Sequence, residues 1–128
     1  RKDIKLNLIK PENDIYFHFD TLQISRCFSN LIKNAIEAVE KIPNPAVEVL
    51  MLTDAKNIKI EIKDNGVGID QTMLSKIFEP YFTTKTKGTG LGLSIVKRII
   101  EDHGGKIKIE KNKNMAGTTS LINFEYNA

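Results

Sequence analysis

The chain has 128 residues, of which 41% are hydrophobic and 27% are charged. This length suits one domain with its own core, because single domains commonly contain about 100 to 150 residues, and the apolar fraction is too high for a disordered chain. The net charge of +3 arises from 19 basic and 16 acidic residues that are mostly interleaved, which does not favour nucleic-acid binding. We therefore expect one domain over residues 1–128, monomeric when isolated.

The single cysteine, Cys27, excludes an intrachain disulfide framework and a cysteine-based zinc cluster. No apolar run is long enough to cross a bilayer, so we expect no direct membrane contact by this domain. Both features fit a cytoplasmic location. Because the chain begins with Arg1 rather than Met, we expect it to be part of a longer protein. Whether that parent protein is anchored in a membrane is left open by this sequence.

In the first third of the chain, residues 4–9 and 15–19 alternate apolar and polar side chains and predict two half-buried strands joined by a turn. The period becomes helical at Asp20, which with Gln23 forms a capping-box variant, and a helix is predicted over 20–42. The apolar stripe expected to face the core consists of Ile24, Cys27, Phe28, Leu31, Ala35, Ala38 and Ile42.

The remainder of the chain predicts four further strands and two further helices. The strands are expected at 47–52, 58–63, 106–110 and 118–124, and the helices at 71–78 and 91–103. Residues 83–90 contain no apolar side chain, so we expect an exposed and mobile segment there. Together these elements predict a single α/β domain.

Asn30 and Asn34 lie four residues apart on the first predicted helix and therefore share one face beside the apolar stripe. Amide oxygens are hard, neutral ligands that suit Mg²⁺ when substrate phosphates supply the negative charge. The alternative is a pair of solvated or capping amides, and the spacing alone does not decide between the two.

Asp64 ends an alternating strand and leads into a loop in which Gly66 and Gly68 let a flat ligand approach the backbone. A carboxylate at this position can accept a hydrogen bond from an amino group such as that of adenine. The alternative is a simple turn, because Asp, Asn and Gly are common turn residues.

The segment Gly88-Thr89-Gly90-Leu91-Gly92 opens the predicted helix over 91–103. Glycine-rich backbone at a helix N-terminus presents free N–H groups to an anion such as phosphate. The spacing fits neither a Rossmann fingerprint nor a P-loop. A flexible hinge that caps the helix is the alternative.

Taken together, four ordered segments resemble the sequence boxes of one family. Residues 30–38 are similar to its N box, 64–69 to its G1 box, 77–85 to its F box and 88–96 to its G2 box. The chain thus resembles, over nearly its whole length, the catalytic ATP-binding domain of sensor histidine kinases, and its short lid resembles that of the nitrogen-regulation-type kinases. Gly117-Thr118-Thr119 is similar to the start of the family's terminal strand.

This resemblance implies the Bergerat fold, an α+β sandwich with a mixed, mostly antiparallel sheet of about five strands backed by about three helices. It also implies ATP and Mg²⁺ as cofactors, with Asn30 and Asn34 as metal ligands and Asp64 as the acceptor for the adenine amino group. Catalytic roles fall to Asn30, Asn34 and Lys85. The implied nucleotide-binding residues are Asn34, Asp64, Gly66, Gly68, Ile69, Phe82, Lys85, Lys87, Gly88, Thr89, Gly90, Leu91, Gly92 and Thr118, with Phe78 and Phe82 anchoring the lid.

The implied activity is transfer of the ATP γ-phosphoryl group to a histidine. ATPases of this fold place a glutamate general base at the first N-box position, where this chain has Asn30, and Glu37 is expected to be a surface charge. His18 and His103 do not resemble the phosphoacceptor box, so the acceptor is expected on a dimerisation domain outside this chain. A response regulator receiver domain is the implied downstream partner. The alternatives are a Ser/Thr kinase of the same fold and an ATP-gated binding module without transfer.

Overall fold

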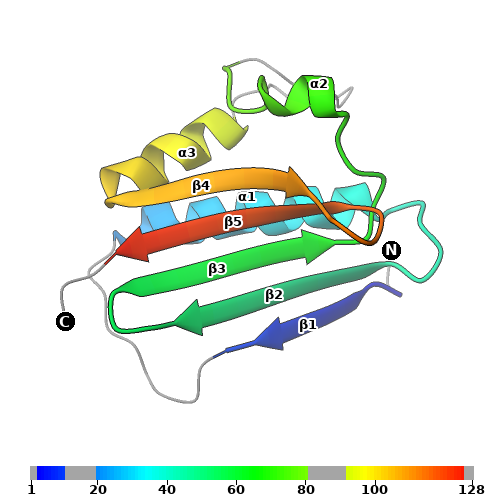
Figure 1. Ribbon diagram of the computed structural model, residues 1–128, viewed down its shortest axis with the longest axis horizontal. Helices are drawn as coiled ribbons and strands as arrows, with labels where there is room; N and C mark the ends of the chain where they lie inside the picture. Colours follow the sequence, from blue (N-terminus) through cyan, green and yellow to red (C-terminus); the bar gives the residue numbers. More distant parts are fainter. Residues whose placement is uncertain (1–2, 11–19, 81–91, 126–128) are drawn as a thin grey trace.

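The computed structural model describes residues 3–10, 20–80 and 92–125 (Figure 1). Within these ranges the strands are β1 (Lys5–Ile9), β2 (Ala46–Thr53), β3 (Asn57–Asp64), β4 (Gly105–Lys111) and β5 (Thr118–Glu125). The helices are α1 (Thr21–Ala38), α2 (Gln71–Leu74) and α3 (Gly92–Asp102). The strand predicted at 15–19 and the lid predicted at 83–90 lie outside the described residues.

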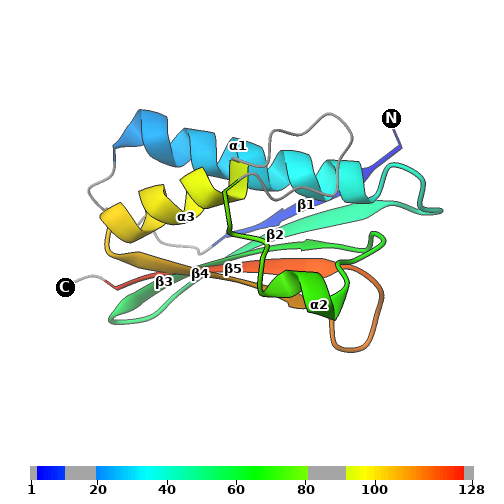
Figure 2. The ribbon, with the colours of Figure 1, turned by 90° about the horizontal axis from the view of Figure 1, so that it is seen from above.

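The five strands form one sheet in the order β1-β2-β3-β5-β4. β1 pairs with β2 in parallel, and the other three pairings are antiparallel. Figure 2 shows α1 and α3 side by side on one face of this sheet. The predicted mixed, mostly antiparallel sheet backed by helices is therefore confirmed.

The core lies between this helical layer and the two central strands, β3 and β5. Alternate residues of β3 and β5 point toward the helices, as the period of a pleated strand requires. The buried core residues of these strands and of α1 and α3 are Ile58, Ile60, Ile62, Ile122, Phe124, Ile24, Cys27, Leu31, Ala35, Val96, Ile99 and Ile100. Each large aliphatic side chain buried in this way contributes about 1.5 to 3 kcal/mol, which holds α1 and α3 at fixed positions on the sheet.

Cys27 is one of these core residues, as expected from its place in the predicted apolar stripe. Its side chain is 1% exposed, and its Sγ lies 3.8 Å from the carbonyl oxygen of Val96 on α3. Burial raises the pKa of the Cys27 thiol. Since the thiolate is the reactive form, this environment disfavours chemistry at the sulfur.

The helix α1 begins where the sequence predicted but ends earlier. Asp20 caps it by accepting a hydrogen bond from the Gln23 N–H at 3.0 Å. The predicted end at residue 42 is wrong, because α1 stops at Ala38. Beyond this point Glu40 and Ile42 donate to carbonyls three residues back, which forms turns instead of α-helix.

Two other predictions need correction. The helix expected over 71–78 is confined to Gln71–Leu74, since Lys76 and Glu79 also donate to carbonyls three residues earlier. All five residues of β1 are exposed, so the expectation of a half-buried strand is wrong there. The reason is positional: β1 is the edge strand next to β2, and α1 lies over β3 and β2.

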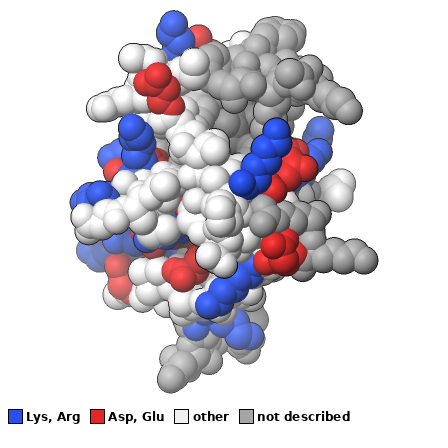
Figure 3. All heavy atoms as spheres, turned by 90° about the vertical axis from the view of Figure 1, so that its right-hand side faces the viewer, with Lys and Arg blue, Asp and Glu red and all other residues white. Residues whose placement is uncertain are grey.

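The surface of the described residues carries charges of both signs. On the face in Figure 3, Lys and Arg side chains occur together with Asp and Glu side chains, as the interleaved sequence predicted. Among the described helices, none combines the length and the apolar character that a membrane crossing requires.

Candidate functional site

Asp64 occupies the last inward-facing position of β3, following Ile58, Ile60 and Ile62 in the same row. It is only 6% exposed, and its Oδ1 accepts hydrogen bonds from the N–H of Gly66 at 2.9 Å and of Thr118 at 3.3 Å. Burial raises the pKa of Asp64, and these two hydrogen bonds oppose that rise. The alternation of β3 thus places a carboxylate at the end of an otherwise apolar row that faces the helices.

The glycines after Asp64 allow the loop to pack directly on the end of α1. A Cβ on Gly66 would overlap the carbonyl oxygen of Ala38, and the Val67 N–H donates to that same oxygen at 3.4 Å. Gly68 has a φ of 77°, a conformation that side chains disfavour. The loop therefore needs glycine at both positions, for close approach at Gly66 and for backbone conformation at Gly68.

Asn30 and Asn34 lie on the same helix as Ala38, at intervals of four residues, and both are half-buried. A Cβ on Gly92, the first residue of α3, would lie 3.9 Å from the Asn30 Nδ2 atom. At a rise of about 1.5 Å per residue, Asn30 and Ala38 are roughly 12 Å apart along α1. One face of α1 thus runs from the Asp64 loop at one end to the first turn of α3 at the other.

The asparagine pair suits Mg²⁺ only in company with an anion. In the part of the chain that the structure describes, no group of three or more His, Cys, Asp or Glu side chains could hold a metal. Two neutral amide oxygens supply ligands without charge, and Mg²⁺ in such sites is held jointly with substrate phosphates. The donor set therefore fits a metal that arrives with a nucleotide.

Thr118 and Ile69 complete the described part of the predicted site. The backbone N–H of Thr118 binds the Asp64 carboxylate, and the residue is 8% exposed. Ile69 is half-buried and follows Gly68 directly. Phe78, predicted to anchor the lid, is also half-buried, and the Lys97 ammonium lies 5.4 Å from its ring centroid. The predicted residues outside the described ranges are Phe82, Lys85, Lys87, Gly88, Thr89, Gly90 and Leu91.

The sequence did not reveal the role of Asn65, which fixes the loop from the other side. Its Oδ1 accepts from the Ala46 N–H at 2.8 Å, and its Nδ2 donates to the Asn44 carbonyl oxygen at 2.9 Å. These bonds join the Asp64 loop to the connection between α1 and β2. An asparagine directly after a strand was the only signal, and it reads equally well as a turn residue.

His103 connects two helices through hydrogen bonds of its imidazole ring. Its Nε2 accepts a hydrogen bond from the backbone N–H of Asp20 at 3.1 Å, so its Nδ1 carries the proton and donates to the Ile99 carbonyl oxygen at 2.7 Å. The imidazole therefore links the C-terminal end of α3 to the N-cap of α1.

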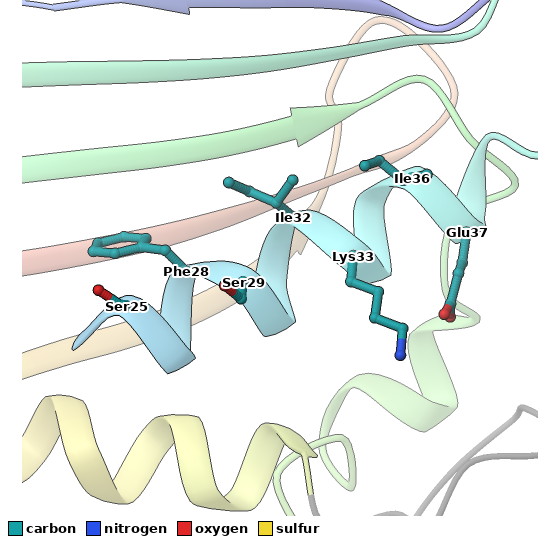
Figure 4. A pocket seen from close by; sticks show the side chains of 7 residues that line it. All are labelled: Ser25, Phe28, Ser29, Ile32, Lys33, Ile36 and Glu37. Atoms are coloured by element: carbon teal, nitrogen blue, oxygen red, sulfur yellow. The ribbon is translucent and has the colours of Figure 1, made fainter. Parts of the chain in front are cut away.

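A shallow apolar groove lies on a different side of α1 from the two asparagines. Figure 4 shows Phe28, Ile32 and Ile36 on the side of the helix away from α3, whereas Lys33 and Glu37, which also line the groove, extend from the opposite edge of the helix. Glu37 is half-buried and lines this groove at the surface of the domain.

Comparison with known proteins identifies the class. Residues 19–127 match the family model described as "Histidine kinase-, DNA gyrase B-, and HSP90-like ATPase". The chain is 38% identical over 113 residues to sporulation kinase A of Bacillus subtilis, covering 88% of this chain and 18% of that protein. It is 41% identical over 96 residues to nitrogen regulation protein NtrY of Azorhizobium caulinodans, covering 71% of this chain and 12% of that protein. The chain thus spans less than a fifth of the length of either relative.

Among the proteins of this family, solved structures of histidine kinases resemble the chain. The catalytic domain of histidine kinase ThkA superposes with a TM-score of 0.84 at 33% identity, covering 98% of this chain and 80% of that one. ThkA is also known in complex with the response regulator protein TrrA, and this chain matches the kinase there at 30% identity and a TM-score of 0.78, covering 95% of this chain and 34% of that one. The chain therefore belongs to the family of histidine kinase-, DNA gyrase B- and HSP90-like ATPases, and its fold is that of the histidine kinase catalytic domain of ThkA.

Proposed function

We propose that ATP lies along α1 with its adenine at Asp64 and its phosphates beside Asn30 and Asn34. The observation that carries this proposal is the alignment of Asn30, Asn34 and Ala38 on successive turns, between Gly92 at one end and the Asp64 loop at the other. Both ends suit the corresponding part of the nucleotide. Asp64 offers a charged acceptor, while the start of a glycine-led helix offers N–H groups.

In this arrangement the chain positions the nucleotide and supplies uncharged ligands for the metal. Asn30 and Asn34 would hold Mg²⁺, which, when bound, neutralises charge on the transferring phosphoryl group. An amide cannot remove a proton from water, so Asn30 offers no general base for hydrolysis next to the phosphates. Lys85 and Lys87 are proposed to bind the phosphates, and Phe82 with the segment 88–92 to border them, on the basis of the family resemblance alone.

The proposed reaction transfers the γ-phosphoryl group to a histidine of a dimerisation domain in the same parent protein. A response regulator would then accept the phosphoryl group, by analogy with the ThkA and TrrA complex. His103 does not compete as the acceptor, because both of its ring nitrogens are engaged between α1 and α3. We further propose that the domain works in the cytoplasm.

A transfer assay tests this function. The chain is incubated with Mg²⁺, ATP labelled in the γ position, and the separately purified dimerisation domain of its parent. We expect an acid-labile phosphoprotein on that domain and only slow hydrolysis by the chain alone, far below the roughly 1 to 100 turnovers per second typical of kinases. Replacing the acceptor histidine by alanine in the supplied domain is the matched control.

The other two functions give different outcomes in the same assay. Acid-stable label on serine or threonine would favour a Ser/Thr kinase of this fold. Tight nucleotide binding with no transfer to any supplied acceptor would favour an ATP-gated binding module. Rapid steady-state hydrolysis by the pure chain would contradict the proposed absence of a general base at Asn30.

A further inference from the structure

The turn between β4 and β5 lies directly against the backbone of Asp64. Gly117 in this turn has a φ of 110°, and a Cβ on it would overlap the carbonyl oxygen of Asp64. The next residue, Thr118, donates its N–H to the Asp64 carboxylate. The turn therefore contacts both the main chain and the side chain of the same residue.

Asn112 connects this turn to Asp64 through its side chain. Its Nδ2 donates to the Asp64 carbonyl oxygen at 2.8 Å and to the Ala116 carbonyl oxygen at 3.1 Å. Its Oδ1 accepts from the Thr119 hydroxyl at 2.5 Å, which fixes the orientation of the amide. The Asn112 N–H closes the turn by donating to the Gly117 carbonyl oxygen at 3.0 Å.

These contacts bear on the carboxylate because Asp64 is held at two points. The Asn112 amide fixes the peptide plane that follows Asp64, and the Gly66 N–H two residues later binds the Asp64 Oδ1. Loss of the amide contact would let this peptide rotate and change the direction in which the carboxylate points. The side chain of Asn112 itself touches only protein groups in these contacts.

We propose that Asn112 is a positioning residue for base recognition: it holds the Asp64 peptide so that the carboxylate accepts from the amino group of adenine. This inference rests on the proposed role of Asp64 in ATP binding and adds a residue 48 positions away in sequence. The Thr119 hydroxyl orients the Asn112 amide and so contributes indirectly to holding the Asp64 peptide.

The test compares Asn112→Asp with Asn114→Asp in titration calorimetry against ATP and against purine riboside triphosphate, which lacks the amino group. Asn112→Asp keeps the shape and the acceptor for Thr119 but cannot donate to Asp64. Asn114 is an exposed residue of the same turn, so its variant makes the same charge change without that loss. We expect Asn112→Asp to weaken ATP binding about three- to tenfold, to leave the analogue nearly unchanged, and Asn114→Asp to alter neither.

Thr119→Val is a milder variant that removes the hydroxyl and should reduce discrimination between the two nucleotides in the same direction. Equal weakening of ATP and the analogue by Asn112→Asp, or unchanged discrimination in both variants, would overturn the proposal. Asp64→Asn distinguishes the positioning role of Asn112 from the proposed adenine contact of Asp64. If Asp64→Asn removes the preference for ATP over the analogue while Asn112→Asp and Thr119→Val do not, only the role of Asn112 is excluded. If Asp64→Asn has no effect on this preference, the adenine contact itself is excluded.

Discussion

The two ends of the α1 face are built in different ways. At the proposed base end, the buried Asp64 carboxylate is fixed by backbone N–H groups from its own loop and from β5, and the loop packs on the end of α1. At the proposed phosphate end, Asn30 and Asn34 present half-buried neutral amides beside the first turn of α3. In the proposed orientation of ATP, the adenine would meet groups that the fold already holds in place, whereas the metal and the phosphates would complete their own site on binding.

The largest effect on stability is expected from Gly66→Ala, which disturbs the packing of the Asp64 loop against the end of α1. The added Cβ would overlap the Ala38 carbonyl, and overpacking of this kind costs about 1 to 3 kcal/mol of unfolding free energy, so we expect a loss near 3 kcal/mol. Gly104→Ala is the matched control. Its φ of 77° strains a side chain but nothing lies within 4 Å, so about 1 kcal/mol is expected. Denaturant unfolding of both variants measures the difference, and equal losses would mean that the contact with α1 is not tight.

Asp64→Asn should separate binding from stability at the same end. The amide keeps the shape but presents a weaker acceptor to the adenine amino group, and we expect a loss of about 1 to 3 kcal/mol of ATP binding free energy. The fold should remain intact because the amide oxygen can still accept from Gly66 and Thr118. Calorimetry with ATP, together with thermal unfolding of the free variant, gives both quantities. Unchanged ATP affinity would exclude Asp64 from the site.

The raised pKa of Asp64 predicts that both the unfolding free energy and the affinity for ATP depend on pH. The folded state binds the proton of the Asp64 carboxyl group more tightly than the unfolded state does. The ionised carboxylate therefore lowers the unfolding free energy above the folded-state pKa, and this loss is relieved as the pH falls through that pKa. Protonation would also remove the proposed acceptor for the adenine amino group. ATP affinity should therefore begin to fall at a higher pH than an exposed aspartate would produce. Calorimetric titrations across the acidic range, with Asp64→Asn as the reference that lacks this titration, measure the effect.

A smaller effect is expected at the contact between the helices. His103→Ala removes the acceptor for the Asp20 N–H and the donor to Ile99, which should lower the unfolding free energy by about 0.5 to 1.5 kcal/mol. Lys106→Ala, at an exposed position of β4, should change it by less than about 0.5 kcal/mol. Chemical denaturation of the two variants would contradict the structural role of His103 if their stabilities were equal.

Local sequence patterns predicted the elements well where the signal is local. The alternation of β3 predicted that Asp64 would end a strand, and Asp20 was correctly predicted to cap α1. The end of α1 was misplaced because the Ala38 carbonyl accepts from Val67, a contact across 29 residues that no helical period contains. The roles of Asn65 and Asn112 were missed for the same reason, since their partners come from other strands and turns.

The most direct test of the proposed nucleotide orientation is calorimetric titration of Asn34→Ala with ATP, once with Mg²⁺ and once with a chelator. If Asn34 holds the metal against the phosphates, the variant should lose about tenfold or more in affinity with Mg²⁺ and almost nothing without it. The proposed adenine contact at Asp64 is left intact by this change. Ser29→Ala, on the exposed side of α1, should match the parent chain in both titrations. Equal losses with and without Mg²⁺ would contradict the account and make Asn34 a structural residue of α1.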